Sequence, residues 1–132
     1  MFNISKDGYM ETDIITRKVI ECAIEVHKQL GPGLLESTYE SCLVYELQQA
    51  ELSPFNQVEL PILYKNSTID AGFRLDILLP RELIIELKAV DKLLPIHTAQ
   101  LITYLKLTGI KTGLLINFNV TRLVDGIKRI QV

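Results

Sequence analysis

Two apolar segments on either side of a short turn constrain the fold of this chain more than any other feature. Within residues 69–79 and again within residues 83–90, apolar side chains alternate with small or charged ones, and Pro80 and Arg81 stand between the segments. A period of two is typical of β-strands, and Pro is common in turns. The pattern therefore predicts two antiparallel strands. One face of the first strand is expected to carry Ala71, Phe73, Leu75 and Ile77.

Periodicity and helix-breaking residues predict the remaining elements. Apolar residues recur every three or four positions in residues 12–30 and 34–49, and Gly31-Pro32-Gly33 separates these two expected helices. The second helix is expected to bury Leu35, Tyr39, Cys42, Leu43 and Leu47. Further elements are expected at residues 58–64 (a strand), 95–108 (a helix), 113–118 (a buried central strand) and 126–132 (an edge strand). The order ααβββαββ, with the first three strands in a meander, indicates a mixed α/β fold with helices flanking a sheet.

Composition excludes several classes of protein. The chain has 132 residues, 48% hydrophobic and 23% charged, so we expect one globular domain over residues 12–132, preceded by a flexible leader over residues 1–11. The net charge of −2 argues against a basic coat for non-specific nucleic-acid binding. No apolar run approaches the roughly 20 residues of a membrane helix, and the first residues lack the apolar stretch of a secretory signal. We therefore expect a cytoplasmic protein with no membrane partner.

The cysteines and histidines give no metal motif by themselves. Cys22 and Cys42 fall in the two helical segments, where we interpret them as buried free thiols; a disulfide and a redox role are the alternatives. Two cysteines cannot form a four-cysteine zinc or iron–sulfur site. His27 and His97 match no zinc-hydrolase pattern.

Charged residues interrupt the two apolar strands at Asp76, Glu86 and Lys88. With the turn near residue 81, antiparallel pairing places residue 76 opposite residue 86, where side chains on one face lie about 5 Å apart at Cβ. Glu86 and Lys88 share that face because they are two residues apart. Adjacent carboxylates repel each other unless a cation lies between them, and Mg²⁺ is held by one or two carboxylates. The pattern fits a site for phosphodiester hydrolysis; the alternative is an ordinary charge cluster on a solvated face.

These residues also carry a resemblance to a known family. Residues 33–39, Gly-Leu-Leu-Glu-Ser-Thr-Tyr, match the signature of the GxxExxY proteins. Asp76 with Glu86-Leu87-Lys88 resembles the active-site motif of the PD-(D/E)XK nuclease superfamily, to which that family is assigned. The resemblance covers about residues 12–130 and implies a restriction-endonuclease-like core, a mixed central sheet flanked by helices. Leu75 stands where the superfamily name has Pro, which leaves the carboxylate in place.

The resemblance implies roles for individual residues. Asp76 and Glu86 become metal ligands for Mg²⁺ or Mn²⁺, with the backbone carbonyl of Leu87 as a third ligand. Lys88 becomes the catalytic lysine. The further catalytic candidates are Glu36, Gln100 and Tyr104. The last two are four residues apart, hence on one helix face, and resemble the accessory Gln-x-x-x-Tyr motif of the superfamily.

The helical residues also have structural interpretations. Glu36 is an acid in a first helical turn, which the helix dipole favours. Gln100 and Tyr104 could form a hydrogen-bonded pair on the surface. We expect Tyr39 to pack in the core and His27 to cap or pack near the end of its helix.

The first functional prediction is a metal-dependent nuclease that hydrolyses phosphodiester bonds in nucleic acid. DNA is the first expectation as partner, although these residues do not separate DNA from RNA. Because the chain is acidic, the basic footprint depends on whether six residues cluster: Lys65, Arg74, Arg81, Lys106, Lys111 and Lys128. One alternative is a non-catalytic nucleic-acid- or partner-binding module, as a homodimer, that keeps the nuclease fold. A weaker alternative is a phosphate-handling enzyme for nucleotides or other small molecules.

Overall fold

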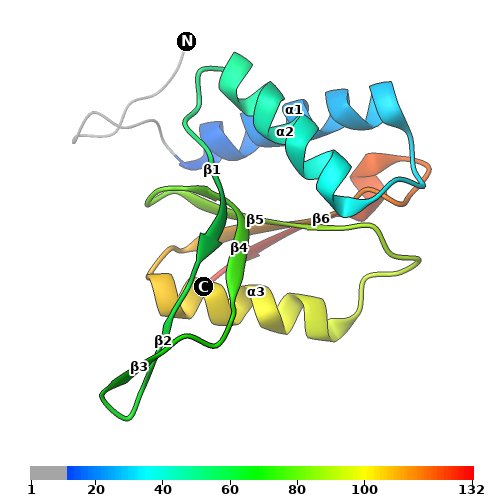
Figure 1. Ribbon diagram of the computed structural model, residues 1–132. Helices are drawn as coiled ribbons and strands as arrows, with labels where there is room; N and C mark the ends of the chain where they lie inside the picture. Colours follow the sequence, from blue (N-terminus) through cyan, green and yellow to red (C-terminus); the bar gives the residue numbers. More distant parts are fainter. Residues whose placement is uncertain (1–11) are drawn as a thin grey trace.

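A mixed five-stranded sheet forms the centre of the computed structural model, which describes residues 12–132 (Figure 1). The strands, in sheet order, are β1 (Phe55–Glu59), β4 (Arg74–Leu79), β5 (Leu83–Lys88), β6 (Thr112–Asn117) and β7 (Ile127–Gln131). β5 and β6 run parallel, and the other neighbouring pairs run antiparallel. The predicted α/β fold is confirmed, and its architecture is consistent with a restriction-endonuclease-like core. The leader predicted for residues 1–11 lies outside the described residues.

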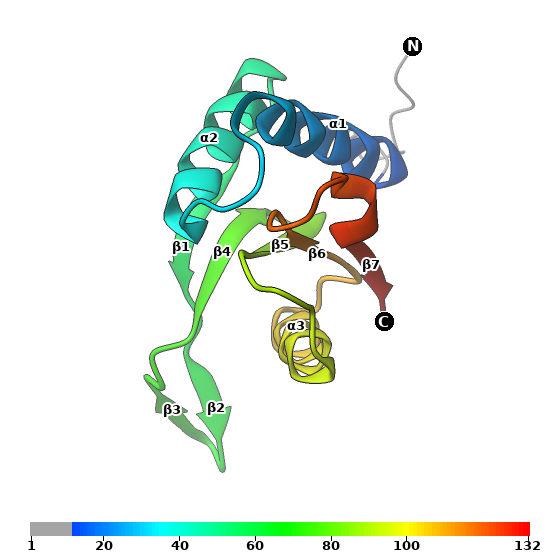
Figure 2. The same ribbon diagram turned by 90° about the vertical axis from the view of Figure 1, so that its right-hand side faces the viewer.

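Helices cover both faces of this sheet. α1 (Thr12–Leu30) and α2 (Glu36–Gln49) lie together on one face, and α3 (Pro95–Thr108) lies on the other (Figure 2). α3 provides the crossover that the parallel pair β5 and β6 requires. The predicted limits of α1 and α3 are confirmed; α3 begins with Pro95 and ends at Gly109, whose φ of 76° suits glycine.

α2 begins two residues later than predicted. Gly31 and Gly33 have φ values of 68° and 96°, a region that glycine enters without a steric cost, and Leu35 is still extended. Leu35 therefore precedes the helical stripe and is 73% exposed, so its predicted burial is wrong. The other large members of the stripe are buried as predicted: Tyr39, Leu43 and Leu47.

The predicted three-stranded meander is wrong in one respect, because residues 58–64 and 69–79 do not form continuous strands. Part of each forms a separate two-stranded ribbon, β2 (Ile62–Tyr64) and β3 (Ser67–Ile69), which projects from the rest of the molecule in Figure 1. The inner parts belong to β1 and β4 of the main sheet. The period-two pattern therefore identified the strands but missed the interruption between them.

Backbone turns set the limits of this ribbon. Lys65 and Asn66 have positive φ values of 47° and 65° and form its two-residue turn, at the predicted position. At its base, Gly72 has a φ of 75°, and its N–H donates to Oδ1 of Asp70 (3.0 Å). This turn ends the pairing before β4 begins. A local turn of this kind leaves the alternation of apolar residues unchanged, which explains why the pattern did not reveal it.

The regular alternation of side chains between the two faces of the sheet is broken in β4 at Asp76. Leu75 packs in the cluster on the α3 side of the sheet, whereas Ile77 packs in the cluster on the α1–α2 side. The prediction that these two side chains share a face is therefore wrong. The backbone of the partner strand is irregular at the same point, because Gln57, between the two pairs that flank Asp76, has a φ of 53° in place of an extended value. A non-extended backbone at this point of the sheet is the physical feature that accompanies the loss of regular alternation.

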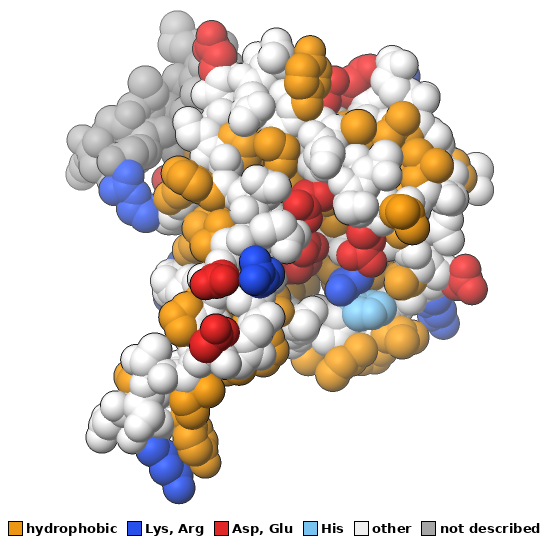
Figure 3. Space-filling view, viewed as in Figure 1, with side chains coloured by type: hydrophobic (Ala, Val, Ile, Leu, Met, Phe, Trp, Pro, Cys, Tyr) orange, Lys and Arg blue, Asp and Glu red, His pale blue; other side chains and the backbone are white. Residues whose placement is uncertain are grey.

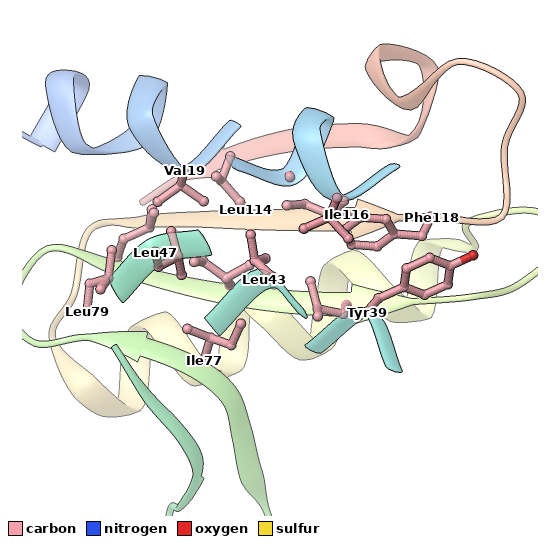
Figure 4. Close-up of a cluster of buried hydrophobic side chains, with 14 of the residues drawn as sticks. Val19, Tyr39, Leu43, Leu47, Ile77, Leu79, Leu114, Ile116 and Phe118 are labelled. Atoms are coloured by element: carbon pink, nitrogen blue, oxygen red, sulfur yellow. The ribbon is translucent and has the colours of Figure 1, made fainter. Parts of the chain in front are cut away.

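Two hydrophobic clusters fill the space between the sheet and the helices. The cluster on the α1–α2 side includes Tyr39, whose ring stacks on Phe118 with centroids 4.4 Å apart and an angle of 10° (Figure 4). The cluster on the α3 side contains Leu101, Tyr104 and Leu105 from that helix. Every residue of β6 is buried between them, which confirms the predicted central strand.

Three smaller expectations can be compared with the structure. Cys22 and Cys42 are free, as predicted, but each is only partly buried. β7 lies at an edge of the sheet with Lys128 and Arg129 exposed, as predicted. Within residues 12–132, no helix combines the length and the apolar character that crossing a bilayer demands.

Candidate active site

The β4–β5 hairpin brings Asp76 and Glu86 together. Ile77 pairs with Ile85, which confirms the predicted register and places residues 76 and 86 opposite each other in the neighbouring position. There the carboxylates bind backbone groups of the opposite strand. The N–H of Asp76 donates to Oε1 of Glu86 (3.2 Å), and the N–H of Leu87 donates to Oδ2 of Asp76 (2.8 Å). The predicted proximity of the two acids is confirmed, and each is held in place by backbone.

Burial next to the partly exposed Asp76 changes the chemistry of Glu86. Glu86 is 4% exposed. The pKa of its carboxyl group is raised to about 9, first by desolvation, then by the charge of Asp76 and by a hydrogen bond between the two carboxyl groups. The N–H of Asp76 and the ammonium of Lys88 lower that pKa, but by less. At neutral pH the pair therefore holds a proton in place of a second negative charge. The alternative of an ordinary cluster on a solvated face does not fit this burial.

Lys88 lies beside a pocket of about 470 Å³ next to the acidic pair. It follows Glu86 on the same face of β5, and the pocket is formed mostly by residues of α3. Figure 3 shows acidic side chains gathered between α2 and α3, with a basic side chain and a histidine next to them. A cation at the edge of an open pocket can reach an anionic ligand there.

Gln100 and Tyr104 of α3 line the same pocket as Lys88, which confirms that they share a helix face. Tyr104 is 3% exposed, so the alternative of a surface pair does not hold for it. Its pKa is raised first by burial and then by the charges of Glu86 and Asp76. Tyr104 therefore stays a protonated donor over the physiological pH range.

Three other sequence candidates lie elsewhere. Glu36 is exposed at the first residue of α2, and no three His, Cys, Asp or Glu side chains among residues 12–132 group as metal ligands. The structure therefore does not join Glu36 to Asp76 and Glu86. Tyr39 packs in the core as predicted, and its hydroxyl donates to the carbonyl of Gly31 (2.6 Å). His27 packs at its helix end, with Nε2 2.8 Å from the carbonyl oxygen of Val120.

Asn117 supports the site although the sequence analysis did not select it. This buried residue ends β6, and its side-chain amide donates to the carbonyl of Val90 (2.9 Å) and accepts from the N–H of Val90 (3.1 Å). The N–H of Phe118 donates to the carbonyl of Lys88 (2.9 Å). These contacts fix the chain directly after the catalytic candidates. A polar residue at the end of an apolar run was the available signal.

Phe73 and His97 are two further pocket residues that the sequence analysis did not assign. Phe73 contacts Tyr104 edge to face, with ring centroids 5.9 Å apart at 65°. His97 lies three residues before Gln100 and seven before Tyr104, a spacing that places all three on one helix face. That spacing was the signal for His97, whereas Phe73 reaches the pocket only because of the bend in β4.

The six basic residues expected to supply a footprint lie on separate elements. They are Lys65 in the ribbon turn, Arg74 in β4, Arg81 before β5, Lys106 in α3, Lys111 before β6 and Lys128 in β7. Arg74 pairs with Glu59 (3.3 Å), and Nζ of Lys128 donates to the hydroxyl of Thr98 (3.2 Å). The footprint is therefore divided among several surfaces.

The arrangement combines a carboxyl pair, an ammonium group and protonated donors around one pocket. Carboxylate oxygens are hard ligands suited to Mg²⁺ or Mn²⁺, and each carboxyl group uses one oxygen for a backbone N–H. A divalent cation would offset the repulsion between the two carboxylates, which, after desolvation, is the next cause of the raised pKa of Glu86. The donor set of Asp76 and Glu86 therefore fits such an ion, with water or backbone oxygens needed to complete its coordination.

Comparison with known proteins agrees with this geometry. A family model described as the PD-(D/E)XK nuclease superfamily matches residues 13–130, which include both strands of the hairpin and all of α3. Neither the comparison with curated proteins nor the comparison with solved structures finds a match. Since the family model spans most of the chain, and the acids of its motif face each other across β4 and β5, this protein belongs to the PD-(D/E)XK nuclease superfamily.

Proposed function

We propose that this protein is a metal-dependent nuclease that hydrolyses phosphodiester bonds in nucleic acid. One observation carries the proposal: Asp76 and Glu86 form a close carboxyl pair in which Glu86 is buried, and this burial, together with the charge of Asp76, raises the pKa of Glu86 to about 9. A buried acid held next to a second carboxyl group is unfavourable for folding alone, so a pair held this closely indicates a function. The superfamily membership makes that function nuclease-like.

Asp76 and Glu86 would hold Mg²⁺ or Mn²⁺, and the carbonyl of Leu87 is the third candidate ligand. The bound cation would supply Lewis-acid charge that polarises the phosphodiester and favours deprotonation of water. Because Glu86 accepts from the N–H of Asp76, and Asp76 accepts from the N–H of Leu87, both acids are oriented before anything binds. A preorganised pair loses little freedom on binding.

Lys88 has the position to bind the phosphate at the edge of the pocket. In hydrolysis, the oxygen of water forms a bond to phosphorus, the bond to the leaving oxygen breaks, and that oxygen takes up a proton. The ammonium of Lys88 would stabilise the negative charge that develops on the phosphate. Gln100 and Tyr104, which line the same pocket, would orient the substrate by donating hydrogen bonds.

The test is cleavage of single- and double-stranded DNA and RNA by the purified chain with Mg²⁺, with Mn²⁺ or with EDTA. We expect cleavage that requires the divalent ion and that Glu86→Gln removes. Glu21→Gln, an exposed acid on α1, is the matched control and should cleave as the wild type does. Absence of cleavage under every condition, or equal cleavage by Glu86→Gln, would contradict the proposal.

Metal binding separates this proposal from the non-catalytic alternative. That alternative is favoured by the observation that Glu36 does not join the acidic pair, which leaves two acidic ligands instead of three in the described part of the chain. A nuclease should take up Mn²⁺ in a calorimetric titration, and Glu86→Gln should weaken the uptake. A module without catalysis should show neither effect. The same preparations, analysed by light scattering, test the predicted homodimer.

Four finer predictions remain attached to this proposal. Membership of the GxxExxY family is supported by the contacts of Tyr39, because its hydroxyl accepts from the N–H of Leu34 (3.1 Å) and so closes the motif loop. A catalytic role for Glu36 predicts that Glu36→Gln lowers cleavage while leaving folding intact. A cytoplasmic location and a preference for DNA also remain predictions.

A further inference from the structure

The pocket beside Lys88 offers more than a place for one phosphate. It has a volume of about 470 Å³, within the roughly 300–1,000 Å³ typical of small-molecule sites. Its wall is formed by residues of different chemistry: Phe73, Lys88, Ile96, His97, Gln100 and Tyr104. The carboxyl pair, Lys88 and this pocket lie on the α3 side of the sheet. A substrate phosphate at Lys88 would therefore have its attached nucleoside next to the pocket.

The charge of the wall restricts what the pocket can hold. Among the residues that line it, Lys88 is the one with a full positive charge, and no acidic residue is among them. A duplex backbone presents one negative charge per about 1.7 Å of axis and is normally bound by several basic residues. A single cation beside apolar and aromatic walls instead complements one phosphate joined to an uncharged, planar group.

The aromatic residues suit a planar group. Phe73 lines the pocket and is only partly buried, and the buried Tyr104 meets its ring edge to face, at 5.9 Å and 65°, which fixes the orientation of the Phe73 ring. Nucleobases stack on such rings, and removing one stacking ring weakens binding by roughly 5- to 150-fold. Stacking depends little on which base is present, so this contact selects for a free base and not for a sequence.

The polar groups of the wall match the edge of a base. Nδ1 of His97 accepts the N–H of Leu94 (3.0 Å), so in the neutral ring Nε2 carries the proton and is the remaining donor. Gln100 provides both a donor and an acceptor from its amide. A few polar atoms within mostly apolar walls are the usual composition of a site that binds one heteroaromatic ring.

We propose that this pocket binds an unstacked nucleobase next to the scissile phosphate, so that the substrate is single-stranded or locally unpaired nucleic acid. This inference rests on the proposed nuclease function and specifies its substrate class. A base within a duplex is stacked on both faces and paired at its edge, and it must leave the helix to enter such a pocket. The energy of unpairing makes a free strand the better ligand.

The experiment measures binding without cleavage, by fluorescence anisotropy of a short labelled DNA strand and of its duplex, with Ca²⁺ in place of Mg²⁺. We expect the single strand to bind at least about tenfold more tightly. One abasic nucleotide, moved stepwise along the strand, should weaken binding by roughly 5- to 150-fold at one position near the cleavage point. Because this scan uses the wild-type protein, it does not depend on the folding of any variant.

Phe73→Ala should lower single-strand affinity by a similar factor, and Phe73→Tyr should restore it. Phe55→Ala, at an exposed phenylalanine in β1 that does not line the pocket, is the matched control and should leave affinity unchanged. A preference for duplex, or an abasic scan with no sensitive position, would overturn the inference. Metal-dependent cleavage of duplex that Glu86→Gln removes would leave the proposed nuclease function intact while refuting the base pocket.

Discussion

The two faces of the central sheet are built differently. On the α1–α2 face, sixteen buried hydrophobic residues of the described chain form one cluster, against eight on the α3 face. Two helices cover the first face, and a single helix covers the second (Figure 2). Packing fills most of the first face, which we call the sealed face. The second, which we call the open face, leaves room for the carboxyl pair, Lys88 and a pocket of about 470 Å³.

This difference shows how one sheet serves stability and chemistry at once. β5 contributes Leu83, Ile85 and Leu87 to the sealed face, while Glu86 and Lys88 lie on the other. Because side chains of a strand alternate, each functional residue is anchored by apolar neighbours on the opposite face. The site is therefore placed on a rigid support, as precise catalysis requires.

The largest effect is expected from the open face. Lys88→Ala should lower the rate of cleavage by about 10²–10³-fold, the range found when one group that stabilises transition-state charge is removed. The melting temperature should change little, since Lys88 is only partly buried. Rates are measured with saturating Mg²⁺ on the preferred substrate. Lys106→Ala, at an exposed lysine in α3, should keep a cleavage rate within about twofold of the wild type. An equal loss of rate in this control would show that the effect is not specific to the position of Lys88.

The sealed face should show the largest loss of stability. Leu43→Ala removes a fully buried side chain from α2 and should lower the free energy of unfolding by about 2–5 kcal/mol. Leu107→Ala, an exposed leucine in α3, should change it by less than about 0.5 kcal/mol. Urea denaturation of both variants gives these values. Similar costs at the two positions would show that the faces do not differ as described.

A pH effect should appear on the open face. The pKa of Glu86 is raised from 4.5 to about 9 in the folded state, so the folded protein binds more protons than the unfolded chain between these values. Its contribution to stability is therefore complete below about pH 4.5 and is lost as the pH rises through about 9. In EDTA the slope should reach on the order of 1 kcal/mol per pH unit.

Denaturation curves across that window, recorded for the wild type and for Glu86→Gln, isolate this contribution. The variant should lack the extra slope, because glutamine does not titrate, and Mg²⁺ should reduce the slope of the wild type by favouring the ionised pair. Identical pH profiles for the two proteins in EDTA would contradict the assigned pKa.

The smallest effect concerns the loop that joins the two helices of the sealed face. Tyr39→Phe keeps the ring stacked on Phe118 but removes the hydroxyl that donates to Gly31 and accepts from Leu34. We expect a loss of about 1–2 kcal/mol in the free energy of unfolding. Tyr45→Phe, at an exposed tyrosine on α2, is the control and should be neutral.

Local patterns predicted most of the secondary structure. The helical period and the Pro and Gly signals gave the limits of α1 and α3, and the alternation in residues 83–90 gave the two faces of β5. The proximity of Asp76 and Glu86 was also predictable, because the turn near Arg81 fixes the register of the hairpin. These features depend on neighbours within a few residues or across one tight turn.

Other features depend on contacts between distant segments. The change of face at Asp76 lies opposite the irregular backbone of Gln57 on another strand, and the ribbon separates at the turn of Gly72; neither feature changes the apolar pattern. Among the described residues Glu36 does not form a ligand group with Asp76 and Glu86, and this depends on where α2 packs, which the GxxExxY spacing does not describe.

The sequence by itself determined most of the strands and helices, and which acids stand opposite each other, because side-chain period and turn position are local properties. Only the tertiary structure decided that Glu86 is buried with a raised pKa, and that α3 brings His97, Gln100 and Tyr104 to a pocket with Lys88 and Phe73. Desolvation and pocket shape arise from the packing of elements that are far apart in the chain.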